Sequence, residues 1–173
     1  RRQVIKQTDV ILAMFLLGHE FTLEEKRRNF LFYDPLTTGD SSLSSCVEAI
    51  VATEIGEYDK AIEHAMAALL MDLADVSGNV HDGVHIASMG GTWMMFVYGF
   101  AGMRDYDGTL AFRPYRPPEP QATIKFPLTY RGQMLEVEIG IEYGIQNSIV
   151  ICIDIDEVRY AIPVEVASSF DSI

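Results

Sequence analysis

The chain has 173 residues and a mass of 19.4 kDa, the size of one ordinary domain or of one domain with a small appendage. Hydrophobic residues make up 49% of it and charged residues 22%, a composition that excludes a disordered chain. Because the formal charge is −12, a broad nucleic-acid-binding surface is also excluded, and a phosphate-bearing ligand would need a local cluster of donors. Cys46 and Cys152 lack the spacing of a disulfide framework or a zinc site, and they fit core residues in a reducing, cytoplasmic compartment.

The first apolar run, residues 10–18, follows Arg1 and Arg2 and so has the outline of a targeting signal. The run is much shorter than the roughly 20 residues that cross a bilayer, and no small-residue cleavage site follows. We therefore predict a buried helix and no membrane association. The chain lacks an initiator methionine and opens directly into helical sequence, which suggests a piece of a larger protein.

Apolar residues at helical spacing predict five helices in the first hundred residues. The expected helices run over about 10–17, from the capping-box pattern at 22–25 to 32, from after Ser42 to 56, over 57–72 and over 85–100. The last of them is apolar on nearly every side. We therefore expect the other helices to surround it.

From Leu110 onward the hydrophobic period changes to two, which predicts strands. The expected strands cover about 124–128, 135–141, 149–155 and 158–164, with a turn at Arg131–Gly132 and an edge position at Pro163. A proline-rich linker at 113–120 precedes them. The expected fold class is mainly α with a small antiparallel β appendage, divided into residues 1–105 and 106–173.

Three connections hold the candidate functional residues. Lys6 and Gln7 offer several donors to a polyhydroxylated or anionic ligand, although these two residues alone favour a solvated helix start. Ser41 and Ser42 open a helix whose free amides form an anion site. Ordinary N-capping by Asp40 or Ser42 is the alternative.

The third connection, residues 79–93, places His85 at the donor-rich start of the last helix, where it can bind an anion or a sugar hydroxyl. His81 and His85 also have the spacing of a metal pair, but no third ligand has motif spacing, so we predict no metal. His19 and His64 are interpreted as structural or solvated residues.

Four segments carry a family resemblance, and they occur in the order KQTDVILAMFLLG, YDPLTTGDSSLSSC, LLMDLADVSGNVHDGVHIASMGGTWMMFVYGFAGMRDYDG and FPLTYRGQMLEVEI. Together they resemble the C-terminal part of the disaccharide phosphorylases of glycoside hydrolase family 65, over about residues 2–141. The resemblance implies an (α/α)6 barrel preceded by a β-sandwich and followed by a small β-sheet domain. Residues 1–105 would then be the later barrel helices and residues 106–173 the sheet domain.

The resemblance also implies a reaction, the inverting phosphorolysis of an α-linked glucose disaccharide to β-glucose 1-phosphate and a free sugar. Such an enzyme needs one carboxylic acid, since phosphate replaces the activated water of an inverting hydrolase. The candidate phosphate ligands are Ser41, Ser42 and His85. No cofactor is implied, inorganic phosphate is the co-substrate, and the intact protein is expected to be a homodimer.

Lys6, Gln7 and Asp34 match the family's sugar-binding region, and Lys6 and Asp34 resemble the pair that contacts the acceptor sugar. Several members carry glutamate at the position of Asp34, and many carry histidine at that of Gly39, so the disaccharide is left open. The catalytic glutamate of the family matches no residue here and is expected upstream, so we expect the chain alone to be inactive. A hydrolase of the same family and a non-catalytic carbohydrate-binding fragment are the alternatives.

Overall fold

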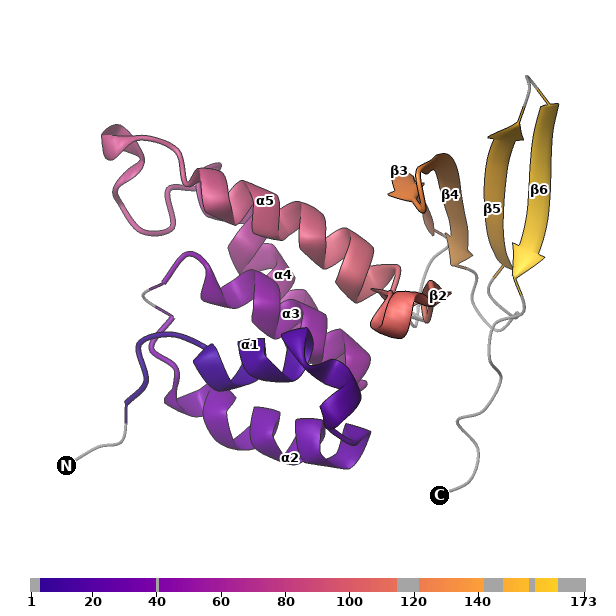
Figure 1. Cartoon of the computed structure of the whole chain (residues 1–173). Coiled ribbons are helices and arrows are strands. Elements are labelled where there is room, and N and C mark those ends of the chain that lie inside the picture. Colours follow the sequence, from indigo (N-terminus) through magenta and orange to yellow (C-terminus); the bar gives the residue numbers. More distant parts are fainter. Residues whose placement is uncertain (1–3, 40, 115–121, 142–147, 156–157, 165–173) are drawn as a thin grey trace. The chain divides into compact units, whose positions relative to one another are not determined.

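The computed structural model describes residues 4–39, 41–114, 122–141, 148–155 and 158–164. The chain forms two compact units, Arg1–Phe100 and Ala101–Ile173, and each is described here by itself. The first unit is helical, and the second contains strands and one short 3-10 turn, Tyr106–Gly108 (η5) (Figure 1). This order confirms the expected fold class, mainly α with an antiparallel β appendage.

Five α-helices build the first unit, each close to its expected range. They are α1 (Asp9–Leu16), α2 (Leu23–Tyr33), α3 (Ser44–Glu54), α4 (Tyr58–Leu70) and α5 (Ile86–Met94). A π-helical segment, Met95–Phe100, continues α5. Short 3-10 turns lie in the connections at Gly18–Glu20 (η1), Asp34–Leu36 (η2) and Val80–Asp82 (η3). None of the helices in the described ranges is long and apolar enough to cross a membrane.

The capping box expected at the start of α2 is present. The Glu25 amide donates to Thr22 Oγ1 at 3.2 Å, and the Thr22 amide donates to Glu25 Oε2 at 2.9 Å. Each side chain thereby satisfies an amide that the first helical turn leaves without a backbone partner. The start of α2 is therefore determined by residues only three positions apart.

The central helix of the first unit is α3, in which every residue from Ser44 to Thr53 is buried. It packs against α1, α2, α4 and α5. The largest fully buried apolar side chains around it come from four elements: Ile11, Met14, Phe30, Ile50, Val51, Met95 and Val97. A polar residue on α3 is consequently enclosed by its neighbours.

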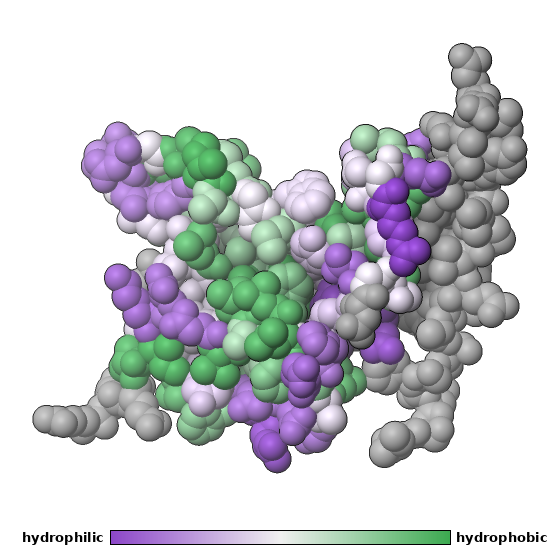
Figure 2. All heavy atoms as spheres, in the orientation of Figure 1, coloured by the Kyte–Doolittle hydropathy of each residue, from purple (hydrophilic) through white to green (hydrophobic). Residues whose placement is uncertain are grey.

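The expectation that the last helix is surrounded on all sides was wrong. Helix α5 turns its small residues Ser88 and Gly91 to the interior. Three of its large side chains are at least 50% exposed: Ile86, Met89 and Trp93. Small residues allow the backbone of α5 to approach α3 closely. The face of α5 that carries Ser88 and Gly91 is therefore buried, although its exposed face carries the larger apolar side chains. Figure 2 shows apolar surface over the helical unit in green.

Gly91 allows a close approach between α5 and α3. A Cβ atom at Gly91 would lie 2.4 Å from Cys46 Sγ and 3.0 Å from Cys46 Cβ, whereas one at Gly90 would meet nothing within 4 Å. We expect Gly91→Ala to lower the free energy of unfolding by about 1–3 kcal/mol through overpacking. Gly90→Ala, its matched control, should raise that free energy by up to about 1 kcal/mol through helix propensity. Urea unfolding of both variants tests this. Equal free energies of unfolding for Gly91→Ala and Gly90→Ala would contradict the close packing at Gly91.

A buried ion pair joins α2 to the end of α3. Lys26 is 2% exposed, and its Nζ lies 2.6 Å from Glu54 Oε1. The next residue, Arg27, pairs with Glu57 at the start of α4 and donates to the Ile55 carbonyl oxygen. The lysine stem packs among apolar residues while its ammonium group meets the carboxylate. Together the two pairs attach α2 to the connection between α3 and α4.

The second unit contains two antiparallel sheets. Strands β1 (Met103–Arg104) and β2 (Ala111–Phe112) pair with each other. The larger sheet has the order β3-β4-β5-β6, formed by Ala122–Tyr130, Gln133–Ile141, Ser148–Ile155 and Val158–Val164. All four strands were expected, and Pro163 lies on the edge strand β6.

Local sequence explains the hairpin between β3 and β4. Arg131 and Gly132 form the expected two-residue turn with φ values of 50° and 79°, the left-handed conformation of a primed hairpin turn. Leu135, Val137 and Ile139 are buried, and the residues between them are more exposed, as the alternation predicts. Most of the linker, residues 115–120, and the side chain of Cys152 lie outside the described residues, whereas the thiol of Cys46 is buried and free.

Candidate functional site

Helices α3 and α5 lie side by side in the same direction. Gly91 of α5 lies beside Cys46 of α3, and Gly99 of the π-helical segment that continues α5 lies beside Ile50, where a Cβ atom would lie 3.4 Å from Ile50 Cα. Moving from Gly91 along α5 and its π-helical continuation to Gly99 therefore means moving along α3 from Cys46 to Ile50. The two helices are parallel, and their N-termini lie at the same end of the helical unit (Figure 1). Two helix N-termini at one end form an electropositive region.

Ser41 and Ser42 form the turn that leads into α3. The Ser41 carbonyl oxygen accepts from the Ser44 amide at 3.1 Å, and Ser41 Oγ accepts from the Leu43 amide at 3.4 Å. The N-cap position is occupied by Leu43, and no described side chain caps the helix. The N-capping alternative for Ser42 is therefore not observed, while Asp40 lies outside the described residues. The Ser44 amide is thus engaged by the turn, whereas no described side chain caps the amides that follow it in the first turn of α3.

His85 is the N-cap residue of α5, and a carboxylate from the end of α4 holds it. Asp72 Oδ1 lies 2.6 Å from His85 Nδ1, and Asp72 Oδ2 accepts from the His85 amide at 2.9 Å. Both bonds favour the ionised carboxylate, so they lower the pKa of Asp72. With Nδ1 engaged, Nε2 is the nitrogen that remains for a ligand, and among the described residues it has no partner.

The first turns of the two parallel helices each contain a buried hydroxyl group. Ser44 on α3 and Ser88 on α5 are both 2% exposed, and the Oγ atoms of both have no hydrogen-bond partner among the described residues. A buried hydroxyl without a partner is costly, which is typical of a place prepared for a ligand or a water molecule. The sequence interpretation did not assign either serine to the site. Their one signal in the sequence is a position in the first turn.

Lys6 and Gln7 form a bend directly after Ile5, which pairs with the segment that follows η2. The Ile5 amide donates to the Leu36 carbonyl oxygen at 2.9 Å, and the Thr38 amide donates to the Ile5 carbonyl oxygen at 2.9 Å. This parallel bridge places Lys6 and Gln7 next to the turn that begins at Asp34, and both side chains are exposed. The structure thus brings the proposed sugar-binding segments together, although they are about thirty residues apart in the sequence.

The Asp34 side chain is 8% exposed and is bound by residues of α4. Its Oδ1 lies 2.7 Å from His64 Nε2, and its Oδ2 lies 3.3 Å from Lys60 Nζ. Burial raises the pKa of Asp34, but the hydrogen bond and charge of His64 and the charge of Lys60 outweigh this and lower that pKa overall. His64 was interpreted as structural or solvated, and the structure shows it partly buried between two carboxylates.

Possible metal ligands occur at one place in the described ranges. Asp34, Glu48 and His64 each offer an atom within 4.8 Å of the others. The ring of His64 lies between the two carboxylates, with Nδ1 at 3.3 Å from Glu48 Oε2. His81 pairs with the adjacent Asp82 at 3.4 Å, and its side chain is 76% exposed.

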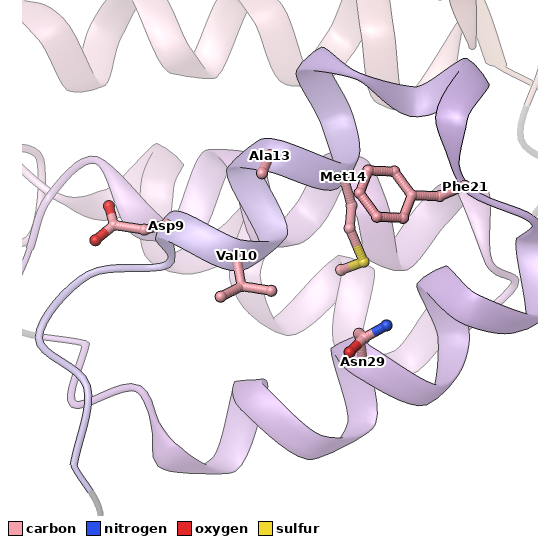
Figure 3. A pocket seen from close by; sticks show the side chains of 6 residues that line it. All are labelled: Asp9, Val10, Ala13, Met14, Phe21 and Asn29. Atoms are coloured by element: carbon pink, nitrogen blue, oxygen red, sulfur yellow. The ribbon is translucent and has the colours of Figure 1, made fainter.

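A small pocket of about 280 Å³ lies between α1 and the start of α2 (Figure 3). None of the residues singled out from the sequence lines it. Its walls are largely apolar, which does not suit a phosphate group. The lining residues are Asp9, Val10, Ala13, Met14, Phe21 and Asn29.

Comparisons with known proteins agree with this architecture. Residues 1–94 match the model of the glycosyl hydrolase family 65 central catalytic domain, and residues 103–142 match that of the family 65 C-terminal domain. The α,α-trehalose phosphorylase of Thermoanaerobacter brockii is 45% identical over 82% of this chain and 18% of its own length. The maltose phosphorylase of Bacillus subtilis is 42% identical over 80% of this chain and 18% of its own.

A third relative, the kojibiose phosphorylase of Caldanaerobacter subterraneus, is 38% identical over 81% of this chain and 18% of its own length. The chain thus spans about 18% of the length of these curated relatives. A solved structure, provisionally described as a kojibiose phosphorylase from the human microbiome, superimposes with a TM-score of 0.76 at 28% identity. The superposition covers 93% of this chain and 24% of the length of that structure's chain. The resemblance inferred from the four sequence segments is confirmed: this chain belongs to glycoside hydrolase family 65.

Proposed function

We propose that the chain is the phosphate-binding and acceptor-binding portion of an inverting α-glucoside phosphorylase. The observation that carries this proposal is the common end of α3 and α5, where Ser41, Ser42 and His85 sit at two parallel helix N-termini. An anion at this end would meet amides, hydroxyl groups and an imidazole in a chain whose net charge is −12. The trehalose, maltose and kojibiose phosphorylases among the relatives act on disaccharides of this class.

In the proposed reaction, an oxygen of phosphate attacks the anomeric carbon of glucose from the face opposite the leaving sugar. The glycosidic bond breaks, and the leaving oxygen takes a proton from a carboxylic acid that this chain does not provide. The products are β-glucose 1-phosphate and a free sugar. Ser41, Ser42 and His85 would hold the phosphate in line with the glycosidic bond. They would contribute to the reaction by orienting the nucleophile and by stabilising its charge.

On the acceptor side, Lys6, Gln7 and Asp34 are proposed to contact the free sugar. The parallel bridge between Ile5 and Thr37 supports this, because it holds the two segments next to each other. The particular disaccharide, a cytoplasmic location and a homodimeric assembly stay predictions from the family resemblance.

The test is whether sugar release requires phosphate. The full-length protein in which this chain occurs would be incubated with maltose, trehalose, kojibiose and nigerose, each with and without inorganic phosphate. We expect β-glucose 1-phosphate from one of these sugars, only with phosphate, and no product from this chain alone. Equal glucose release without phosphate would show a hydrolase instead, and binding without product would show a carbohydrate-binding protein.

Asp72 offers a prediction that is specific to the phosphate side. Its carboxylate accepts two hydrogen bonds from His85, whereas an asparagine has one acceptor oxygen. Asp72→Asn should therefore disturb the ring of His85 and raise the KM for phosphate about tenfold or more, the loss of one hydrogen bond to a charged group. Asp75→Asn is the matched control, since Asp75 Oδ1 accepts a single bond from the Val80 amide that asparagine can keep. Equal phosphate KM values for both variants would contradict the role of Asp72.

A further inference from the structure

A buried polar network lies under the segments that carry Lys6 and Asp34. At its centre is the ring of His64 on α4, with Nε2 at 2.7 Å from Asp34 Oδ1 and Nδ1 at 3.3 Å from Glu48 Oε2. The side chains of His64, Asp34 and Glu48 are 15%, 8% and 3% exposed. The network thus connects the end of α2, the central helix α3 and helix α4 through one imidazole.

The ring of His64 has little freedom to turn. Besides its two carboxylate partners, it meets the ring of Phe30 edge-on, with centroids 6.3 Å apart and planes at 86°. Phe30 itself is fully buried on α2. Because both nitrogens and the ring edge are engaged, the position of His64 determines where Oδ1 of Asp34 lies.

Acidic and basic side chains alternate through the network. Lys60 Nζ contacts Asp34 Oδ2 at 3.3 Å and Glu63 Oε2 at 3.1 Å, so it lies between two carboxylates. Burial raises the pKa of Glu48, as does the neighbouring charge of Asp34, against the opposing effect of His64. Asp34 in contrast stays ionised, since His64 and Lys60 lower its pKa in spite of burial. Asp34 is therefore a carboxylate that keeps its charge because α4 supplies its partners.

We propose that His64 is a positioning residue that holds the Asp34 carboxylate in place for the acceptor sugar, and that Glu48 in turn holds His64. This inference rests on the proposed function, in which Asp34 contacts the acceptor. Because α4 is also followed by Asp72, which holds His85, the same helix positions one residue of each half of the site.

The same three side chains could alternatively bind a divalent cation. Two features favour the hydrogen-bonded network. The nitrogens of His64 face different carboxylates, and Asp34 already has a cationic partner in Lys60. A metal would have to displace these contacts, so the cation is treated as an outcome of the test.

The experiment uses the full-length protein and compares His64→Leu with His64→Gln, which keeps a donor for Asp34. The dissociation constant for glucose is measured by calorimetry, and the KM values for acceptor and for phosphate are measured in the synthetic and phosphorolytic directions. We expect His64→Leu to weaken glucose binding and raise the acceptor KM about tenfold, the effect of losing roughly 1.4 kcal/mol. We expect the phosphate KM to change less than twofold, and His64→Gln to recover part of the loss.

Two controls separate positioning from general damage. His19→Leu removes a histidine that is 44% exposed and pairs with the adjacent Glu20, and it should leave both constants unchanged. Glu48→Gln keeps the side-chain volume while removing the charge that faces Nδ1, and it should raise the acceptor KM severalfold without affecting phosphate. If His64→Leu does not fold, His64→Gln and Glu48→Gln still carry the comparison.

Three results would overturn the proposal. The first is unchanged glucose binding in His64→Gln and Glu48→Gln, and the second is an equal rise of the acceptor and phosphate KM values. The third is a loss of activity with a chelator that zinc restores in the wild type but not in His64→Gln, which would assign the cluster to a metal. Failure of the proposed function looks different, because the wild type would then release glucose without phosphate.

Discussion

Replacing His85 with alanine is expected to raise the KM for phosphate about 10- to 150-fold in the full-length protein, the effect of losing roughly 1.5–3 kcal/mol of hydrogen bonding to a charged group. His85 lies at the start of α5, next to the parallel start of α3, and Asp72 engages its Nδ1. The other nitrogen, Nε2, is proposed to form the hydrogen bond with phosphate. Steady-state phosphorolysis at varied phosphate gives the result directly.

The matched control is His81→Ala in the same connection. The side chain of His81 is 76% exposed and its contact is the adjacent Asp82, so the KM for phosphate should stay within a factor of two. The acceptor KM in the synthetic direction should change little in either variant. If His85→Ala lost acceptor binding and phosphate binding equally, His85 would be a structural residue and not a phosphate ligand.

The second large effect is expected for stability. Lys26→Met should lower the free energy of unfolding by about 2–4 kcal/mol, because it removes the ammonium group that offsets the Glu54 carboxylate in a mostly buried pair. Methionine fills nearly the same volume, so a cavity contributes little to this loss. Urea unfolding of the protein, followed by helical circular dichroism, measures the change.

Arg27→Met provides the comparison from the adjacent residue of α2. Arg27 also pairs with a glutamate of the connection between α3 and α4, but its side chain is 46% exposed. An ion pair of this kind contributes at most about 1 kcal/mol. A loss for Lys26→Met no greater than that for Arg27→Met would mean that burial does not strengthen the pair with Glu54.

Much of the fold could be predicted from the sequence, because its causes are local. The capping box of Thr22 and Glu25 involves residues three apart, and the turn at Arg131–Gly132 needs only two residues with positive φ. Helical and alternating periodicity predicted all five α-helices and the four strands of the larger sheet. The family was also identified from the sequence, since four long segments in order are specific without any coordinates.

The candidate site could be predicted only in part. Ser41, Ser42 and His85 were selected because each precedes a helix, and their joint role in binding phosphate stays a prediction. The sequence did not point to Asp72 or His64 as partners of candidate residues. Asp72 is separated from His85 by 13 positions, and His64 from Asp34 by 30. Hydrophobic periodicity predicts which residues share a helix face, but it does not predict which residues of another helix that face contacts.

The sequence by itself determined the types of elements, their order and the family. Tertiary structure alone decided that α3 rather than α5 is enclosed and that α3 and α5 begin at the same end. It also decided that α4 and the turn after it supply a partner to each half of the proposed site. The physical reason is packing. Small residues such as Gly91 permit one close approach between helices, and that approach selects which distant polar groups become neighbours.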